Sequence, residues 1–313
     1  MRSDEPIPRG VADTTIEIDG RLLGLTNLEK LFWPKLRITK GDLLQYYARV
    51  APALLPHLRD KAIVMKRYPN GVAGDFFFMK RAPAARPAWI RTCPIAHSSG
   101  NVIEFALAND RPSLLWLINL GCIDLNPWYS PCEAPEEPEY LHFDLDPCDA
   151  PFDAVLEAAL IVRDALQSLG MAVYPKTSGG DGMHLYVGIK RGPLQHEVWA
   201  LAKSISKELA RAHPDILTAE YKVAKRPRGR VLLDYNQNRF GATLASIYSV
   251  RPTPEASVST PVTWDEVQHG IEPAQFTMRN MPERIETIGD LWAALAKKAG
   301  RYDLKKLLHT AQK

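Results

Sequence analysis

Residues 140–146 read YLHFDLD, and this short stretch carries the strongest structural and chemical pattern in the chain. Its alternation predicts a β-strand whose Phe143 and Leu145 side chains point into a core. Because alternate side chains of a strand share one face, we expect Asp144 and Asp146 to point the same way. Two carboxylates ~5 Å apart repel each other by about 3 kcal/mol at an effective dielectric constant of ~20. A divalent cation removes that cost, and hard carboxylate oxygens suit Mg²⁺ or Mn²⁺.

Taken alone, a pair of acids at this spacing is more often two solvated side chains on an exposed sheet face. A second predicted strand, residues 231–234 (VLLD), ends in Asp234 after three apolar residues. If the two strands share a sheet, the acids complete a three-carboxylate site for two metals, of the kind that performs in-line phosphoryl or nucleotidyl transfer. The prediction therefore depends on Asp234 lying beside Asp144 and Asp146.

A glycine-rich turn lies between the two acidic strands in the sequence. Residues 173–189 (VYPKTSGGDGMHLYVGI) predict two strands joined by this turn, which has three glycines in the four positions 179–182. Glycines let backbone N–H groups approach an anion closely, and Ser178 and His184 are able to donate hydrogen bonds to phosphate oxygens. No Gly-Lys-Ser/Thr follows, so this is not a Walker loop. The alternative is a tight hairpin turn with a structural histidine.

A basic run directly precedes the strand that ends in Asp234. Five basic residues and no acid occur within nine positions: Lys222, Lys225, Arg226, Arg228 and Arg230. One interpretation is a solvated strand edge that discourages aggregation. The other is contact with a triphosphate or a nucleic-acid backbone, which would make binding fall steeply with salt. The net charge, 39 − 36 = +3, is too small to indicate a polyanionic partner by itself.

Composition and length bound the remaining possibilities. The chain has 313 residues, of which 46% are hydrophobic and 24% charged, and this excludes disorder along the whole length. No run of about 18 apolar residues occurs, and the first ten residues lack the apolar core of a secretory signal. We therefore expect a cytoplasmic protein with no membrane partner. Residues 1–13 are expected to be mobile, and residues 14–313 to form one catalytic domain of two intimate lobes.

Local patterns predict the other elements. Without a regular βαβ period, the mixture of short strands and helices indicates an α+β enzyme. Two strands are predicted around Asp19-Gly20 (14–24), followed by a helix over LEKLFW that Thr26-Asn27 caps and Pro34 stops. A helix over 41–58, which Thr39 caps, and a strand over 61–68 come next. Further helices are predicted over 111–120, 152–169 and 195–212, and a helical tail over 284–311 has an apolar face with Trp292, Leu295, Leu307 and Leu308.

Eight segments, in this order, resemble the polymerase domain associated with bacterial DNA ligase D, within the archaeo-eukaryotic primase superfamily. They are LTNLEKLFWP with Thr39-Lys40, VMKRYPNG, FFFMKRAP, LLWLINLG, HFDLDP, TSGGDGMH, LLDYNQN and YSVRP, from about residue 25 to 251. Any one motif is weak, whereas eight in register are specific. The resemblance implies a primase-polymerase fold: two mixed or antiparallel sheets flanked by helices, with an RRM-like catalytic core. No Lys-x-Asp-Gly ligase motif occurs, so we expect a stand-alone form.

Position by position, the resemblance also implies roles for individual residues. Asp144, Asp146 and Asp234 match the metal-binding carboxylates of the family. Residues that hold the incoming nucleotide are matched by Lys66, Ser178, Gly179, Gly180, His184 and Arg251. The pocket for a downstream 5′-phosphate is matched by Asn27, Lys30 and Lys40, and an aromatic pair that stacks on template bases by Phe77 and Phe78. The alternatives are ordinary surface charges for the two lysines and a core position for the phenylalanines.

The implied activity is template-directed nucleotidyl transfer in nonhomologous end joining, with gap filling and a preference for ribonucleotides. It implies two divalent metal ions, Mn²⁺ or Mg²⁺, and NTP or dNTP as substrate. The expected partner is gapped or broken DNA with a 5′-phosphate, the candidate protein partners are Ku and a separate DNA ligase, and the expected location is the cytoplasm, at the nucleoid. Three alternatives stay open: a primase that starts chains de novo, a catalytically weak protein that bridges DNA ends, and a metal-dependent phosphohydrolase.

The sequence departs from the family pattern at two places. Asp124-Leu125-Asn126 stands where ligase D polymerase domains often have Glu-Leu-His or Glu-Ile-His, and Asp181 stands where they often have lysine. Asn126 is neither a strong metal ligand nor a cation, and Asp181 reverses a charge near the triphosphate. We therefore expect nucleotide affinity and metal use to differ from those of the ligase-linked relatives.

Overall fold

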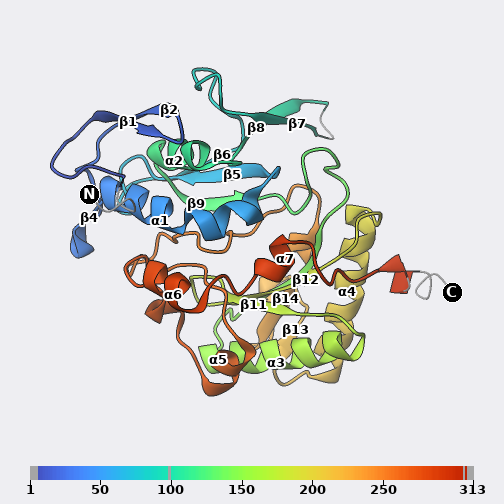
Figure 1. The fold of residues 1–313 in the computed structure, drawn as a ribbon. Helices are drawn as coiled ribbons and strands as arrows, with labels where there is room; N and C mark the ends of the chain where they lie inside the picture. The colour runs from blue at the N-terminus through green and yellow to red at the C-terminus, as the bar shows by residue number, and fades with distance from the viewer. Residues whose placement is uncertain (1–5, 98–99, 306, 309–313) are drawn as a thin grey trace. The chain divides into compact units, whose positions relative to one another are not determined.

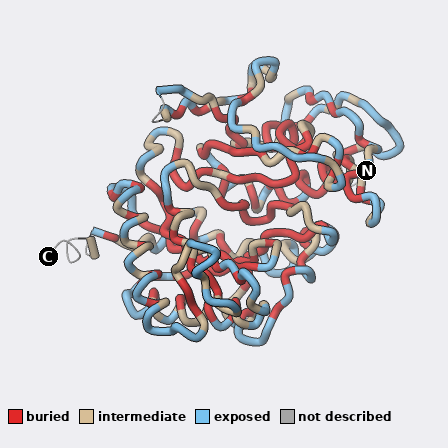
Figure 2. Tube along the Cα trace, turned by 180° about the vertical axis from the view of Figure 1, so that it is seen from behind, coloured by how far each residue is buried: buried red, intermediate tan, exposed pale blue. Residues whose placement is uncertain are grey.

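The computed structural model describes residues 6–97, 100–305 and 307–308, which form helices and mixed sheets (Figure 1). The described chain divides into two compact units. Unit 1 comprises the described residues up to Trp128 with Ala245–Ser259 and Phe276–Asp290, and unit 2 comprises Tyr129–Leu244, Thr260–Gln275 and the described residues from Leu291 onward. Buried residues, red in Figure 2, follow the strands of both units. Within the described ranges, every helix is too short or too polar to cross a membrane.

Unit 2 is built on a five-stranded sheet in the order β11-β12-β10-β14-β13. The strands are β10 (Tyr140–Asp146), β11 (Tyr174–Thr177), β12 (Met183–Gly188), β13 (Leu217–Thr218) and β14 (Val231–Asp234), and the helices are α3 (Phe152–Ser168), α4 (Gln195–Ala212), α5 (Trp264–His269) and α7 (Ala293–Ala296). All neighbouring strands are antiparallel except the parallel pair β13 and β14. Phe143 and Leu145 are fully buried, as the alternation predicts, and α3 and α4 pack against this sheet.

Unit 1 contains a second sheet in the order β6-β5-β8-β7, with β9 also paired to β5. Its elements are β5 (Ala62–Arg67), β6 (Phe77–Met79), β7 (Thr92–Ala96), β8 (Val102–Leu107) and β9 (Cys122–Pro127), the small strands β1 (Thr14–Ile18), β2 (Arg21–Leu25), β3 (Leu31–Trp33) and β4 (Ile38–Thr39), and the helices α1 (Lys40–Leu58), α2 (Arg111–Asn119) and α6 (Met281–Ile288). Helix α1 packs against both α2 and α6.

Several local predictions are confirmed. The β1–β2 hairpin turns at Asp19 and Gly20, which have the positive φ angles (50° and 75°) that this tight turn requires. Helix α1 begins after Thr39 with a capping box: the Thr39 hydroxyl accepts from Asp42 N, and the Asp42 carboxylate accepts from Thr39 N. Helix α4 has the predicted bounds.

Two predicted helices are wrong. Residues 31–33 of LEKLFW form strand β3, which pairs with β4, because Asn27 has a positive φ (56°) and Phe32 and Trp33 bury both of their side chains in the core. The helical tail is interrupted, since α6 ends at Ile288 before Gly289 (φ 74°) and α7 has only four residues. The end of the predicted tail, 309–311, lies outside the described residues. The single catalytic domain over 14–313 stays a prediction.

Candidate active site

Two acidic side chains meet across neighbouring strands of unit 2. Asp144 on β10 and Asp234 at the end of β14 are direct partners in the antiparallel ladder. Directly opposed side chains have Cβ atoms about 4.5–5.5 Å apart, and like charges at such positions destabilise a sheet. Asp146 lies two residues after Asp144, on the same face. The structure therefore places Asp144 directly opposite Asp234, with Asp146 farther along the same face of β10 and opposite Leu232.

The row of polar side chains continues across two further strands. His184 on β12 is the ladder partner of Asp144, and Lys176 on β11 is the partner of His184. His184 Nε2 lies 3.3 Å from Asp144 Oδ1, and its Nδ1 lies 2.7 Å from Lys176 Nζ. Lys176 and His184 are buried, at 0% and 3% exposure. We call Lys176, His184, Asp144 and Asp234, one from each of four adjacent strands, the polar row.

The polar row constrains the histidine tautomer. An ammonium group only donates, so a protonated Lys176 requires His184 Nδ1 to accept, and the ring proton then lies on Nε2. That proton faces Asp144. Sequence reasoning missed Lys176, although the register of a hairpin closed by the glycine turn places it opposite His184.

The Asp234 carboxylate is held by three donors. The Tyr221 hydroxyl donates to Oδ1 (2.6 Å), as does Asn236 N (2.8 Å), and Gln237 Nε2 donates to Oδ2 (3.1 Å). Burial and the hydrogen bond to Asp234 raise the pKa of Tyr221, which therefore stays a protonated donor at neutral pH. Hydrogen bonds of this kind fix the orientation of a carboxylate that binds a metal.

The glycine turn lies directly beside the acidic strand. A Cβ atom at Gly182 would collide with the carbonyl oxygen of Leu145, so only glycine fits there. Ser178 Oγ accepts from Gly180 N (3.1 Å) and Gly182 N (3.2 Å), while Gly179 adopts a positive φ of 75°. Two of the N–H groups expected to face an anion thus donate within the turn.

His142 is a buried neighbour of the acids that the sequence did not distinguish. Its ring lies 4.1 Å from that of Tyr129 and 5.2 Å from that of Tyr186, centroid to centroid. Both ring nitrogens are fully buried, and the described residues offer them no well-formed hydrogen bond beyond an approach to the Gln237 backbone. Burial lowers the pKa of His142 to about 3, so this neutral ring adds no positive charge beside the acids.

In unit 1, Lys66 and Arg251 share one buried carboxylate. Asp124, 2% exposed, is the ladder partner of Lys66, and its Oδ2 lies 3.4 Å from Arg251 Nε. Asn126 Nδ2 donates to the same carboxylate at 3.3 Å. Burial lowers the pKa of Lys66, and Asp124 opposes that shift. Asp124 and Asn126, which belong to the first of the two departures from the family pattern, therefore lie directly beside Lys66 and Arg251.

Asn27, Lys30 and Lys40 also lie in unit 1, and Lys40 is not a surface charge. Lys40 is 4% exposed and donates to Thr26 O at 2.6 Å, whereas Lys30 Nζ donates to Pro69 O at 2.8 Å. Burial, which Asp13 opposes and the charges of Lys30 and Arg67 reinforce, lowers the pKa of Lys40 to about 8. Asn27 is exposed.

The phenylalanine pair is exposed, which excludes the core interpretation. Phe77 is 45% and Phe78 is 60% exposed. Successive residues of β6 point to opposite faces, so Phe78 lies beside Lys66 (5.8 Å from Nζ to the ring centroid) and Phe77 beside Arg67 (5.1 Å from Cζ). Phe76, which was not predicted, is 49% exposed and lies closest to Lys66, at 4.1 Å.

The basic run is mostly solvated, but one of its members reaches the acidic strand. Lys222, Lys225 and Arg228 are exposed. Arg226 Nη1 lies 2.9 Å from the sulfur of Cys148, two residues after Asp146.

The acids suit a divalent metal by their chemistry. Three carboxylates form a hard oxygen donor set, and a cation between Asp144 and Asp234 would relieve the repulsion of the opposed charges. Within the described ranges, no three His, Cys, Asp or Glu side chains already converge on one point. Metal binding therefore requires the carboxylates to turn toward each other.

Comparison with known proteins gives concordant matches. Residues 39–292 match the family model of the LigD primase-polymerase domain. The multifunctional non-homologous end joining protein LigD of Mycolicibacterium smegmatis is 31% identical over 274 residues, 87% of this chain and 36% of the relative. The bifunctional non-homologous end joining protein LigD of Bacillus subtilis is 30% identical over 269 residues, 85% of this chain and 43% of the relative. The chain thus spans less than half the length of these relatives.

A solved structure matches the fold. The polymerase domain from Mycobacterium tuberculosis Ligase D, in complex with DNA, superposes with a TM-score of 0.82 at 28% sequence identity. The match covers 88% of this chain and 98% of the solved one.

Proposed function

This chain belongs to the LigD primase-polymerase domain family, and on that premise we propose that it is a template-dependent nucleotidyltransferase acting at gaps and ends of DNA. Membership confirms the predicted α+β primase-polymerase fold. The observation that carries the proposal is the direct pairing of Asp144 with Asp234, beside Asp146. A pair of directly opposed, partly exposed carboxylates costs stability in the free protein, which is reasonable where a bound cation is needed for activity.

In the proposed reaction, Asp144, Asp146 and Asp234 hold two divalent ions, Mn²⁺ or Mg²⁺. Such ions lower the pKa of an attacking hydroxyl and neutralise a leaving pyrophosphate when bound. Tyr221 orients the Asp234 carboxylate. His184 presents its Nε2 proton at the acidic strand, where it is able to donate to a phosphate oxygen of the nucleotide.

The remaining nucleotide contacts rest on the family resemblance. Ser178, with Gly179 and Gly180 of the turn, is assigned to the incoming NTP or dNTP. In unit 1, Lys66 and Arg251 supply positive charge that suits a triphosphate, and Phe77 and Phe78 offer exposed rings for base stacking.

We further propose gapped or broken DNA as the partner, because the relatives are named for non-homologous end joining and the matching structure is in complex with DNA. Ku and a separate DNA ligase are the proposed protein partners, and the nucleoid is the proposed location.

Primer extension on a one-nucleotide gap with a 5′-phosphate tests the function. With Mn²⁺ or Mg²⁺ and either NTPs or dNTPs, we expect one templated addition to the primer 3′-hydroxyl. Products on single-stranded template without any 3′ end would indicate de novo priming instead. If no nucleotide is incorporated under any condition while DNA ends are still bridged, the protein is a DNA-end-bridging protein.

Lys40 gives a pH prediction for the proposed 5′-phosphate pocket. Its pKa of about 8, against an ordinary value of 10.5, means that its charge is lost as pH rises through 8. We expect the preference for 5′-phosphate over 5′-hydroxyl DNA to fall between pH 7 and pH 9, by up to about tenfold per pH unit above the pKa. Fluorescence anisotropy with the two DNAs measures this preference.

The lowered pKa of Lys40 also predicts how its replacement affects the preference and how the free energy of unfolding depends on pH. Lys40→Met is expected to remove both the preference and its pH dependence, whereas Lys35→Met, at an exposed lysine, changes neither. Because the unfolded chain binds more protons between about pH 8 and 10.5, the free energy of unfolding rises with pH in that window. A preference that is constant from pH 7 to pH 9 would exclude Lys40 from the pocket.

A further inference from the structure

Unit 1 contains a cavity of about 250 Å³ whose wall is rich in arginine, and no role in the proposed reaction accounts for it. The N-terminal segment, the turn before β4, helix α1 and the loop before α6 each contribute one arginine to the wall. We call this cavity the arginine pocket, and its arginines are Arg9, Arg37, Arg49 and Arg279.

The positive charge of the arginine pocket is only partly compensated. Within the described residues, the Arg9 and Arg37 side chains have no hydrogen bond or ion pair. Arg279 Nη2 donates to a backbone carbonyl, that of Leu36, at 2.8 Å. Arg49 pairs with Glu286 at 2.7 Å, but both side chains are substantially solvated, at 34% and 65% exposure.

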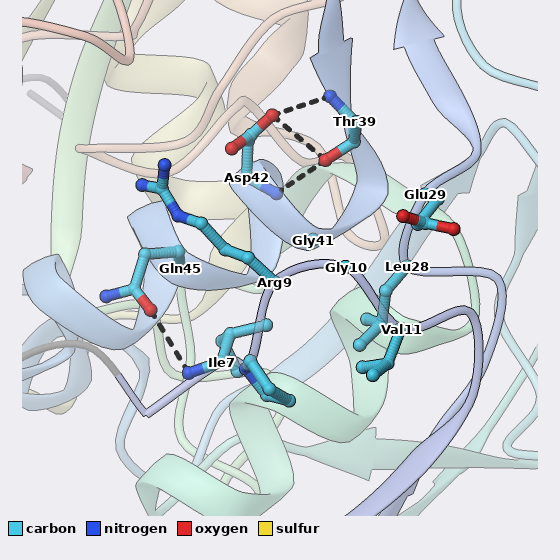
Figure 3. Close-up of a pocket in the computed structure, with 11 residues that line it drawn as sticks. Ile7, Arg9, Gly10, Val11, Leu28, Glu29, Thr39, Gly41, Asp42 and Gln45 are labelled. Carbon is cyan, nitrogen blue, oxygen red and sulfur yellow. Dashed lines mark hydrogen bonds between the residues drawn. The ribbon is translucent and has the colours of Figure 1, made fainter.

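The wall of the arginine pocket contains one carboxylate, that of Asp42, which already accepts hydrogen bonds at the start of α1. Asp42 Oδ2 accepts from Thr39 N at 2.8 Å and from the Thr39 hydroxyl at 2.9 Å, in the capping box of α1 (Figure 3). Guanidinium groups remain protonated at any physiological pH. Four guanidinium groups against the carboxylates of Asp42 and Glu286 leave a net charge of 4 − 2 = +2, so the pocket suits an anion with more than one negative charge.

A second cavity, of about 280 Å³, adjoins the arginine pocket and shares Arg9, Asp42 and Gln45 with it. Its other side includes the apolar residues Ile7, Val11 and Leu28 and, at one edge, the carboxylate of Glu29 (Figure 3). Gln45 Oε1 accepts from Ile7 N at 3.1 Å, which anchors the N-terminal segment over both cavities. A cationic pocket beside an apolar one fits a ligand that joins an anionic group to a flat or apolar group.

We propose that the arginine pocket binds a phosphate group of a nucleotide. Phosphate oxygens accept paired hydrogen bonds from guanidinium forks, and a phosphate's two charges match the excess on this wall better than one carboxylate does. The arginine pocket has other lining residues than Asn27, Lys30 and Lys40 of the proposed 5′-phosphate pocket, although their chain neighbours Leu28, Glu29, Thr39 and Gly41 line the adjoining cavity. The nucleotide comes either from a free compound or from a nucleic-acid strand.

The test uses two probes without metal, so that its outcome does not depend on catalysis. Inorganic pyrophosphate, titrated by calorimetry, represents the free source. A 12-nucleotide single-stranded DNA without a 5′-phosphate, followed by fluorescence anisotropy at several salt concentrations, represents the strand source. The variant is Arg9→Gln with Arg37→Gln, because these exposed side chains make no hydrogen bond or ion pair with the described residues whose loss would unfold the protein. The matched control is Arg59→Gln with Arg211→Gln, two exposed arginines outside the pocket.

We expect the pocket variant to lose at least tenfold affinity for the probe that occupies the site, while the control variant keeps its affinity. A loss for pyrophosphate alone identifies a free nucleotide. A loss for the DNA, with a salt slope smaller by about 1.4 for two lost contacts to a single strand, identifies a strand. Equal affinity of the pocket and control variants for both probes would overturn the proposal. If the double variant is unfolded by circular dichroism, Arg9→Gln alone gives the same comparison.

Discussion

Replacing Asp144 by asparagine is expected to abolish nucleotide incorporation while making the metal-free protein more stable. Asparagine keeps an oxygen that accepts from His184 Nε2 but removes the charge that opposes Asp234. Loss of one metal-binding carboxylate should lower the incorporation rate by about 1,000-fold or more. Relief of the like-charge pair should raise the free energy of unfolding by about 0.2–1 kcal/mol, or the melting temperature by about 1–3 °C.

The opposite signs of these two effects distinguish a metal site from a structural one. Gap filling measures the first effect, and thermal unfolding in metal-free buffer measures the second. Asp153→Asn, at an exposed carboxylate in the first turn of α3, is the control that loses the same charge and keeps its activity. Full activity of Asp144→Asn, or a clear loss of stability, would contradict the assignment.

Replacing Arg251 by glutamine is expected to destabilise the protein and to weaken nucleotide binding. The Asp124 carboxylate, 2% exposed, would lose its guanidinium partner and keep Asn126 and Ser249 as hydrogen-bond donors, with Lys66 as its ladder partner. Removing one partner of a buried ion pair typically costs about 3–5 kcal/mol, and the partial exposure of Arg251 reduces this to about 2–4 kcal/mol. Urea denaturation measures the loss.

A second substitution separates the structural effect from the functional one. Asp124→Asn removes the buried charge, so the double variant should recover most of the lost stability. Nucleotide affinity, measured with a fluorescent nucleotide, should stay low in the double variant because the positive charge for the triphosphate is still missing. If the affinity recovers together with the stability, Arg251 supports the fold and does not contact the nucleotide.

The sequence predicts the two acidic strands well because their signals are local and strong, whereas it leaves their pairing as a condition. The alternation in residues 140–146 and the apolar run before Asp234 each define a strand and its inward face. Their pairing joins residues 90 positions apart, and the resemblance to a known family supports it. Lys176 was not predicted as a site residue because a lysine in a short strand is expected to face solvent. In the structure it is fully buried against His184.

The structure differs from the sequence-based expectations where tertiary contacts, which no local pattern indicates, decide the outcome. Residues 31–33 read as part of a helix, but the burial of Phe32 and Trp33 and the pairing of β3 with β4 override that propensity. A tertiary contact likewise excludes the alternative of a helix-surface charge for Lys40, because its side chain turns inward to the carbonyl of Thr26. Both outcomes depend on tertiary contacts of unit 1.

Anomalous diffraction from crystals grown with Mn²⁺ and a nonhydrolysable nucleotide tests the account most directly. It predicts an anomalous peak about 2.1 Å from carboxylate oxygens of both Asp144 and Asp234, a peak that is absent from crystals of Asp144→Asn. Well-ordered nucleotide with no manganese between these two carboxylates would contradict it.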